Sequence, residues 1–149
     1  MIIVLILLVA TIGYTYYADI TAIEKMEFNV DYVTIPEIGF TYFKLNFVLN
    51  ISNPTNYKVS SLSIAFNIYI ANISFGDGIV SNISLHAQSS VKRNMELTIG
   101  YAGLVEGVID AIKKGRFVLS VKGKGMAEVV WGLTKASRNF EIKYMYPSE

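Results

Sequence analysis

The chain has 149 residues, the size of one domain, and its composition of 52% hydrophobic and 17% charged residues excludes disorder. Thirteen basic and 12 acidic residues leave a formal net charge of +1, so we expect no nucleic-acid partner. The absence of cysteine excludes disulfides and thiolate metal sites. These observations favour one folded domain without a polyelectrolyte ligand.

Residues 1–18 contain no charged side chain and begin with an unbroken apolar run from Ile2 to Ala10. As a helix, this segment would rise about 27 Å, close to the roughly 30 Å hydrocarbon layer of a bilayer. Tyr14, Tyr16 and Tyr17 follow, where aromatic rings prefer the headgroup region, and Asp19 marks the return to water. The pattern predicts a transmembrane helix that anchors the chain in a lipid bilayer.

Two other interpretations of this segment remain open. A cleaved secretory signal normally carries a basic residue before the apolar run, whereas the first basic residue here is Lys25, and Tyr16 stands three residues from a cut after Ala18. A core helix would be apolar on one face only, whereas this segment is apolar on all sides. The absence of early basic residues also leaves the orientation in the membrane undetermined.

Asn50, Asn72 and Asn82 are each followed by isoleucine and serine, which is the acceptor pattern for N-glycosylation. The same pattern arises from polar, outward-facing positions on strands. Because glycosylation requires a chain that crosses the membrane, the three sites favour an extracellular domain on a single-pass cell-membrane protein.

Alternation of apolar and polar side chains dominates residues 19–149 and predicts antiparallel strands. Arg93 takes an inward position, which indicates an edge strand or a bulge there, and Pro36 with Gly39 is expected to end the first strand. We expect a bend at Gly76 to Gly78. The expected strands are 26–32, 42–51, 61–70, 73–80, 83–85, 91–99, 117–125, 129–131 and 140–144.

Residues 104–112 break this pattern, because their apolar side chains recur at helical spacing. Lys113 and Lys114 fall in the last turn, and Gly115 suits the position after the helix end. The predicted fold is therefore an all-β antiparallel sandwich with one short helix, preceded by the N-terminal transmembrane helix.

The residues that usually carry catalysis are scarce. His86 is the only histidine, so we expect it to be structural or exposed rather than catalytic or metal-binding. Glu106 and Asp110 indicate a solvated helix face, and Asp77 indicates a turn. We expect no catalytic residue, no metal and no cofactor.

Two glycine-rich or basic segments also have ordinary structural explanations. Gly123-Lys124-Gly125 lacks the strand-loop-helix context of a phosphate site and is expected to be a strand kink. A basic concentration could face an anionic membrane, but we expect mainly a charged helix end. It comprises Lys113, Lys114, Arg116, Lys122 and Lys124.

The run from Leu45 to Asn56 is an alternating strand closed by Asn-Pro-Thr-Asn. It resembles the opening of the water-stress and hypersensitive-response domain of type 2 late-embryogenesis-abundant proteins and of related bacterial and archaeal chains. The spacing to Leu62 and Ile64, the step at residues 83–87 and the helix before Gly123 follow the family's order, over roughly residues 40–145. The family's commoner ending is Asn-Pro-Asn, so the subfamily stays open.

This resemblance implies an immunoglobulin-like or fibronectin-like sandwich behind a membrane segment, with no catalytic residue and a role in stress protection or membrane-proximal binding. High Ile and Tyr content is consistent with a thermophile, and we expect an archaeal source. The partners would be the bilayer, further copies of the chain or cell-envelope proteins.

The alternative function is a filament subunit resembling an archaeal type IV pilin, with the N-terminal helix in the fibre core. Against it, the basic residue and small-residue cleavage site that precede such helices are not seen before Met1, although processing would remove them. An enzyme that depends on His86 ranks third.

Overall fold

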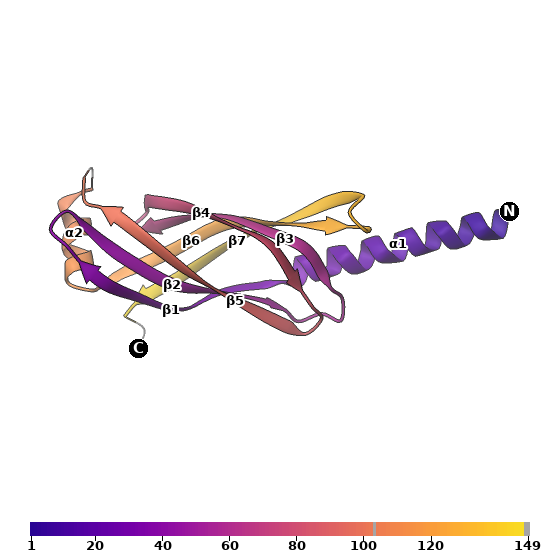
Figure 1. Cartoon of the computed structure of the whole chain (residues 1–149), viewed down its shortest axis with the longest axis horizontal. Helices are drawn as coiled ribbons and strands as arrows, with labels where there is room; N and C mark the ends of the chain where they lie inside the picture. Colours follow the sequence, from indigo (N-terminus) through magenta and orange to yellow (C-terminus); the bar gives the residue numbers. More distant parts are fainter. Residues whose placement is uncertain (103, 148–149) are drawn as a thin grey trace.

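The computed structural model describes residues 1–102 and 104–147, which form two helices and seven strands (Figure 1). Helix α1 projects from one end of an elongated β domain, and helix α2 lies at the other end. The elements in chain order are α1 (Ile2–Lys25), β1 (Glu27–Ile38), β2 (Tyr42–Asn53), β3 (Val59–Ile70), β4 (Ile73–Leu85), β5 (Ser89–Gly100), α2 (Glu106–Lys113), β6 (Phe117–Val129) and β7 (Thr134–Tyr146).

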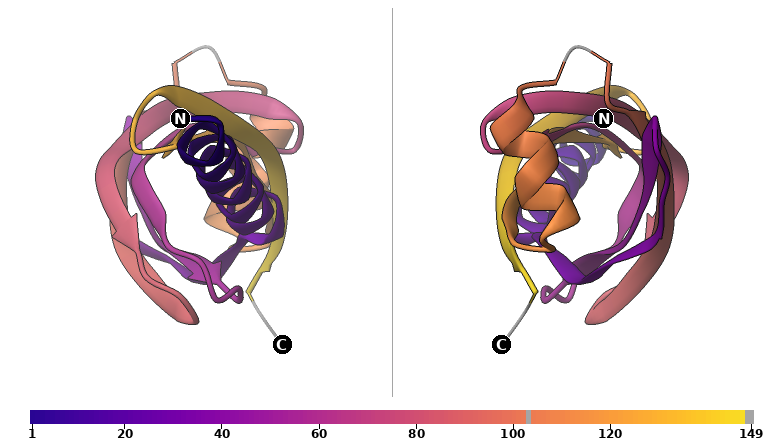
Figure 2. Two further views of the ribbon diagram at one scale, coloured as in Figure 1. Left: turned by 90° about the vertical axis from the view of Figure 1, so that its right-hand side faces the viewer. Right: turned by 90° about the vertical axis from the view of Figure 1, so that its left-hand side faces the viewer.

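The strands form two antiparallel sheets that pack face to face. One has the order β1-β2-β5 and the other β4-β3-β6-β7. Viewed along the long axis, the sheets curve around a common interior with α1 and α2 at opposite ends (Figure 2). The predicted all-β sandwich with one short helix and an N-terminal apolar helix is confirmed.

The core consists of the alternate side chains that the sequence places on one face of each strand. On β2 these include Phe43, Leu45 and Phe47, which are 1% exposed or less. The Phe47 ring meets the Phe66 ring of β3 edge-on, with 6.1 Å between their centroids. The alternation in residues 42–51 and 61–70 therefore predicted the correct inward faces.

Strand β1 confirms that the first strand closes at Gly39 but corrects the expectation that Pro36 helps to end it. It continues through Pro36 to Ile38, with register shifts after Val30 and Thr34. Proline is tolerated here because β1 is an edge strand and Pro36 lies in the register shift between Thr34 and Glu37, without a paired residue on β2.

Two further boundaries were wrong because single strands are longer than the sequence pattern indicated. Residues 73–80 and 83–85 both belong to strand β4. The strand continues through Asn82, although the φ of Asn82 is 58°. The strand expected at 129–131 is the end of β6 followed by a turn that contains Trp131.

The kink expected at Gly123-Lys124-Gly125 is absent, since β6 pairs with β7 in continuous register through it. Gly123 instead makes room: a Cβ there would lie 2.5 Å from the Ala65 carbonyl oxygen and 2.7 Å from the Phe140 ring. The Phe140 ring in turn stacks on the Phe28 ring, with 4.2 Å between centroids. Glycine here allows aromatic packing between the sheets.

Other local predictions are confirmed. Arg93 is exposed on β5, an edge strand. The bend expected at Gly76 to Gly78 is an exception: these residues pair in register with Phe66 to Ile68, and the bulge lies at Phe75. Gly115 follows α2 with a φ of +69°, and its N–H donates to the Ile112 carbonyl at 3.0 Å.

Candidate membrane-proximal site

Helix α1 is long and apolar enough to cross a membrane, with a mean hydropathy of 1.8 over its best 18-residue window. It extends past Ala18 to Lys25, so residues 19–25, expected in the sandwich domain, continue the helix. Large apolar side chains on all sides of its first half are exposed, among them Ile2 at 74% and Val9 at 62%. The apolar half of α1 is thus uncovered within the described chain.

Two threonine hydroxyl groups of α1 bond within the helix. Thr11 Oγ1 donates to the Leu7 carbonyl at 2.8 Å, and Thr15 Oγ1 donates to the Thr11 carbonyl at 2.8 Å. Such back-bonding satisfies a hydroxyl without water, as a hydrocarbon environment requires.

The last turns of α1 pack into the end of the sandwich. Ala18, Ala22 and Ile23 share one helix face and are buried, and Met26 is fully buried where the helix ends. Strand β1 begins at Glu27, the next residue, so no linker separates the helix from the sheet. Helix and sandwich therefore form one packed unit.

Two polar contacts fix this junction. Asp19 Oδ2 accepts a hydrogen bond from the Val130 N–H at 2.8 Å, which ties the helix to the turn between β6 and β7. The Arg138 guanidinium donates to the Met26 carbonyl, at the helix end where a cation also suits the helix dipole.

The Asn53 side chain joins two turns at the same end. It is 1% exposed, and its Nδ2 donates to the carbonyls of Tyr57 at 2.6 Å, Leu85 at 3.3 Å and His86 at 3.2 Å. Its Oδ1 accepts from the Thr55 N–H at 3.1 Å and from Thr55 Oγ1 at 2.6 Å. The Asn-Pro-Thr-Asn segment thus connects the β2–β3 turn to the β4–β5 turn.

This network sets the position of Tyr57. The Tyr57 N–H donates to Thr55 Oγ1 at 3.2 Å, and the Tyr57 ring meets the Tyr14 ring of α1 edge-on at 6.4 Å between centroids. Hydrogen bonding with the Tyr14 hydroxyl raises the pKa of Tyr57 above its ordinary value. The motif that ends β2 therefore contributes directly to the contact with α1.

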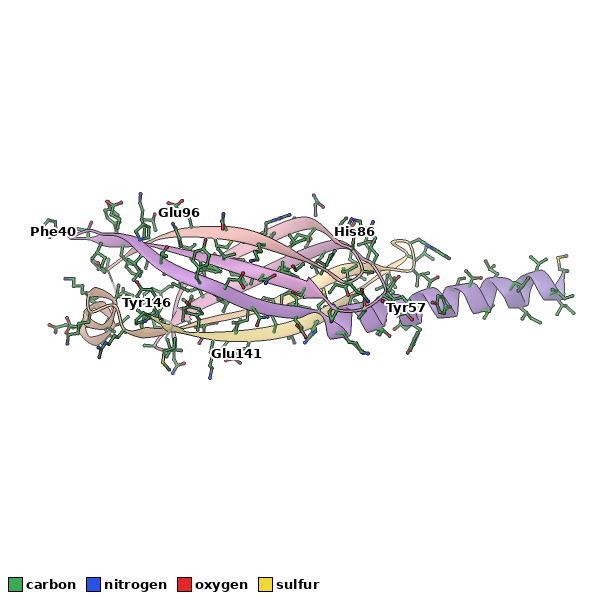
Figure 3. All side chains as sticks on the ribbon, turned by 90° about the horizontal axis from the view of Figure 1, so that it is seen from below. Phe40, Tyr57, His86, Glu96, Glu141 and Tyr146 are labelled. Carbon is green, nitrogen blue, oxygen red and sulfur yellow. The ribbon has the colours of Figure 1, made fainter. Side chains whose placement is uncertain are left out.

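A cavity of about 570 Å³ lies between α1 and these turns. Figure 3 shows Tyr57 and His86 near the end from which α1 projects, and Phe40 and Tyr146 at the opposite end. Side chains of aromatic and of both charged types surround the cavity, so it suits an interfacial environment better than a dry core. They include Tyr14, Tyr57 and Trp131 together with Asp19, Lys58 and Glu128.

The three glycosylation candidates differ in accessibility. Asn72 is exposed in the β3–β4 turn, and Asn82 is exposed on β4. Asn50 is partly buried on the central strand β2, where its Nδ2 donates to Asp31 Oδ1 at 3.3 Å. A glycan on Asn50 would have to replace that hydrogen bond, so Asn72 and Asn82 are the better acceptors.

The remaining candidates do not gather at the α1 end as a reactive group. His86 is exposed, as expected, and it is its carbonyl that accepts the bonds of Asn53 and Ser89. Glu106 and Asp110 are exposed on α2, and Asp77 is exposed on β4 rather than in a turn. Across residues 1–102 and 104–147, no group of three His, Asp or Glu side chains could hold a metal ion.

The basic concentration is divided between two places. Lys113, Lys114 and Arg116 lie on and after α2, at the end away from α1. Lys122 lies on β6, 3.8 Å from Glu141 and 5.1 Å from the centre of the Tyr69 ring. These residues are therefore not placed to assist α1 at a membrane surface.

Sequence reasoning missed three residues of this end. Asp19 was interpreted only as the return to water, Asn53 only as a turn residue, and Trp131 as part of a strand. Asn53 is a polar residue at the end of β2, a position where side chains often bond to nearby backbone groups, whereas Asp19 lies within α1 and carries no such local signal. The contacts with Val130 and Leu85 span 111 and 32 residues of sequence and need the fold.

No family model matches the sequence, and no curated protein matches it. Among solved structures, the chain is similar to an Arabidopsis thaliana protein with a TM-score of 0.54 and 19% identity, covering 79% of this chain and 81% of that one. An Archaeoglobus fulgidus protein has a TM-score of 0.43 and 12% identity, covering 78% of this chain and 97% of that one. A late-embryogenesis-abundant protein has a TM-score of 0.44 and 13% identity, covering 97% of this chain and 85% of that one. The first similarity shows a shared fold.

Proposed function

We propose that this chain is a non-enzymatic, membrane-anchored β-sandwich that acts at the bilayer surface as a stress-protective or binding protein. The observation that carries the proposal is the construction of α1. Its first half offers bare apolar surface on all sides, while its last turns are buried in the sandwich core. Such a helix needs lipid around one half and protein around the other.

The junction also favours a permanent anchor over a cleaved signal. Cleavage after Ala18 would divide a continuous helix and remove a buried residue from its contact with the sandwich. It would also make Asp19, which accepts the Val130 N–H, the charged N-terminal residue. Retention of the helix preserves these contacts.

The protective part of the proposal rests on the resemblance of residues 40–145 to the water-stress domain and on the shared sandwich fold. Under this proposal the sandwich protects or binds and catalyses no reaction. An extracellular location is part of the proposal and depends on use of the acceptor sites Asn72 and Asn82. The filament alternative has no specific observation in its favour among the described residues.

Membrane integration is tested by alkaline carbonate extraction of cell membranes that contain the full chain. We expect the wild type to stay in the pellet and a Leu5→Lys/Leu8→Lys variant to be released, because each lysine at mid-membrane costs about 3 kcal/mol. Leu5 and Leu8 are 59% and 55% exposed, so the sandwich should melt at an unchanged temperature. Complete extraction of the wild type would refute the anchor.

Protection is tested by drying and rehydrating dye-loaded vesicles. Vesicles that carry the full chain should leak several-fold less than empty vesicles. The control is the same α1 segment fused to an unrelated soluble β domain at matched density. Equal leakage with the fusion would assign any effect to the helix alone and would refute a protective role for the sandwich.

A further inference from the structure

The turn between β6 and β7 exposes two large apolar side chains. Trp131 is 70% exposed and Leu133 is 76% exposed. A tryptophan and a leucine held in water together on one turn are costly, because neither buries its apolar surface within the described chain. The turn therefore has an apolar tip, and a partner that covered it would remove this apolar surface from water.

The backbone holds this tip in a defined shape. Val130 and Trp131 have φ values of 55° and 54°, in the left-handed region that a β-branched residue such as valine rarely adopts. The Val130 N–H donates to Asp19, and the Leu133 N–H donates to the Val130 carbonyl at 3.0 Å. The exposure of Trp131 is thus built into a fixed turn, at a conformational cost.

The tip lies level with the aromatic end of the apolar helix. Trp131 lines the same cavity as Tyr14, Thr15 and Ala18 of α1. The β6–β7 turn extends beside α1, toward the N-terminal side of the sandwich (Figure 1). Since Tyr14 belongs to the tyrosine cluster that closes the apolar run, Trp131 stands where a membrane would have its interface.

We propose that the turn of residues 130–133 is a second bilayer contact, with the Trp131 ring in the headgroup region of the leaflet from which α1 emerges. The inference rests on the proposed anchoring by α1. A lipid bilayer is the occupant because the turn is continuous with the helix surface that lipid would already cover. Tryptophan is the side chain most suited to this level, with an apolar body and one N–H donor.

Two contacts have a mechanical consequence that a single helix lacks. A helix alone leaves the domain free to rotate about the helix axis, and tilt is set by neighbouring contacts and interfacial anchors. With Trp131 and α1 both held, one side of the sandwich would face the membrane permanently. The sheet edges and the α2 end would then keep fixed directions in the space above the bilayer.

The chain provides its own probe, because Trp131 is its only tryptophan. Full-length protein is reconstituted into phosphatidylcholine vesicles, and flotation first establishes that it is anchored. We expect blue-shifted Trp131 emission, strong quenching by lipids brominated near the headgroup end of the acyl chain, and little quenching by aqueous iodide.

A matched control moves the probe to the far tip of the sandwich. The Trp131→Phe/Phe40→Trp variant places the indole at a position that is 102% exposed and distant from α1. Its emission should be red-shifted and quenched several-fold more by iodide than by brominated lipid.

Each outcome separates the two proposals. Failure to float with vesicles would refute anchoring by α1. Flotation with a Trp131 probe that behaves like the Phe40→Trp probe would refute the second contact alone. Shielding from iodide without quenching by brominated lipid, or shielding that disappears when the protein is diluted in lipid, would identify a protein partner or a second copy and would also overturn it.

Discussion

At the α1 end of the sandwich, buried and partly buried side-chain hydrogen bonds tie three turns and a helix together. At the opposite end, the side-chain contacts beside the β1–β2 hairpin are exposed, such as the hydrogen bond that the Tyr42 hydroxyl donates to Glu37. Asn53 joins the β2–β3 and β4–β5 turns, and Asp19 joins α1 to the β6–β7 turn. At the far end α2 caps itself through Gly115 and Arg116, whose N–H groups donate to carbonyls of its last turn. The β1–β2 hairpin there ends in the fully exposed Phe40.

This difference suggests a division of labour. The α1 end holds its turns against a long helix that projects from the sandwich, and it uses buried and partly buried polar contacts that specify one arrangement. At the far end no such helix has to be held, and local backbone geometry is sufficient to fix the turns. Substitutions should therefore destabilise the α1 end more than the far end.

The largest effect is expected for Asn53→Ala. The substitution removes the donor to three carbonyls and the acceptor for Thr55, and buried groups left without partners should cost about 3 kcal/mol. Urea unfolding of the full chain in mild detergent, followed by circular dichroism, measures the loss. Asn56→Ala, an exposed neighbour in the same motif, should change stability by less than about 0.5 kcal/mol. Equal effects would refute the role of Asn53.

Asp19→Ala should cost about 1–2 kcal/mol, because the partly buried Val130 N–H loses a charged acceptor. The same unfolding experiment applies, with Glu24→Ala as the control, since Glu24 is exposed on the same helix. In the Asp19 variant, the wavelength of Trp131 emission should also differ more between protein in vesicles and protein in detergent. A neutral Asp19→Ala would show that packing alone holds the turn.

The far end is tested by Gly115→Ala, which places a side chain at a φ of +69° and should cost about 1 kcal/mol. Gly107→Ala is the control on the same helix α2, where a Cβ would meet nothing within 4 Å. It should stabilise the protein by about 0.5–1 kcal/mol through helix propensity. Melting temperatures should move in opposite directions, and a common direction would contradict the helix-cap geometry.

The smallest effect concerns pH. A hydrogen bond from Lys92, 2.9 Å from Asp31, lowers the pKa of Asp31. Because the folded pKa lies below the unfolded one, the stabilisation is present above the unfolded value of about 3.9 and is lost as pH falls through the folded value. The exposed pair should contribute under about 1 kcal/mol. Asp31→Asn should remove this part of the acid dependence, and an unchanged acid limb would refute it.

The local rules recovered most of the fold. Alternation on β2 and β3 identified the inward faces, and helical spacing with Gly115 identified α2. They failed at Pro36, because the tolerance of proline depends on which strand lies at the sheet edge. They failed at Gly123, because the reason for glycine is a ring from β7 that lies across it.

The candidate site was less accessible to such rules. The apolar run of α1 and its tyrosine cluster could be recognised, since a window of hydropathy is a local property. The burial of Ala22 and the position of Trp131 beside Tyr14 depend on residues more than a hundred positions apart. The residues adjacent in sequence give no indication of such contacts.

By itself the sequence determined the elements and their faces: an apolar helix, alternating strands and one amphipathic helix, each fixed by side-chain spacing along the backbone. Only the tertiary structure decided that α1 continues into the core without a linker, that Asn53 ties two turns, and that Trp131 stands beside the helix at its aromatic end. The physical reason is that spacing governs which face is buried, whereas close packing between distant segments governs what each face meets.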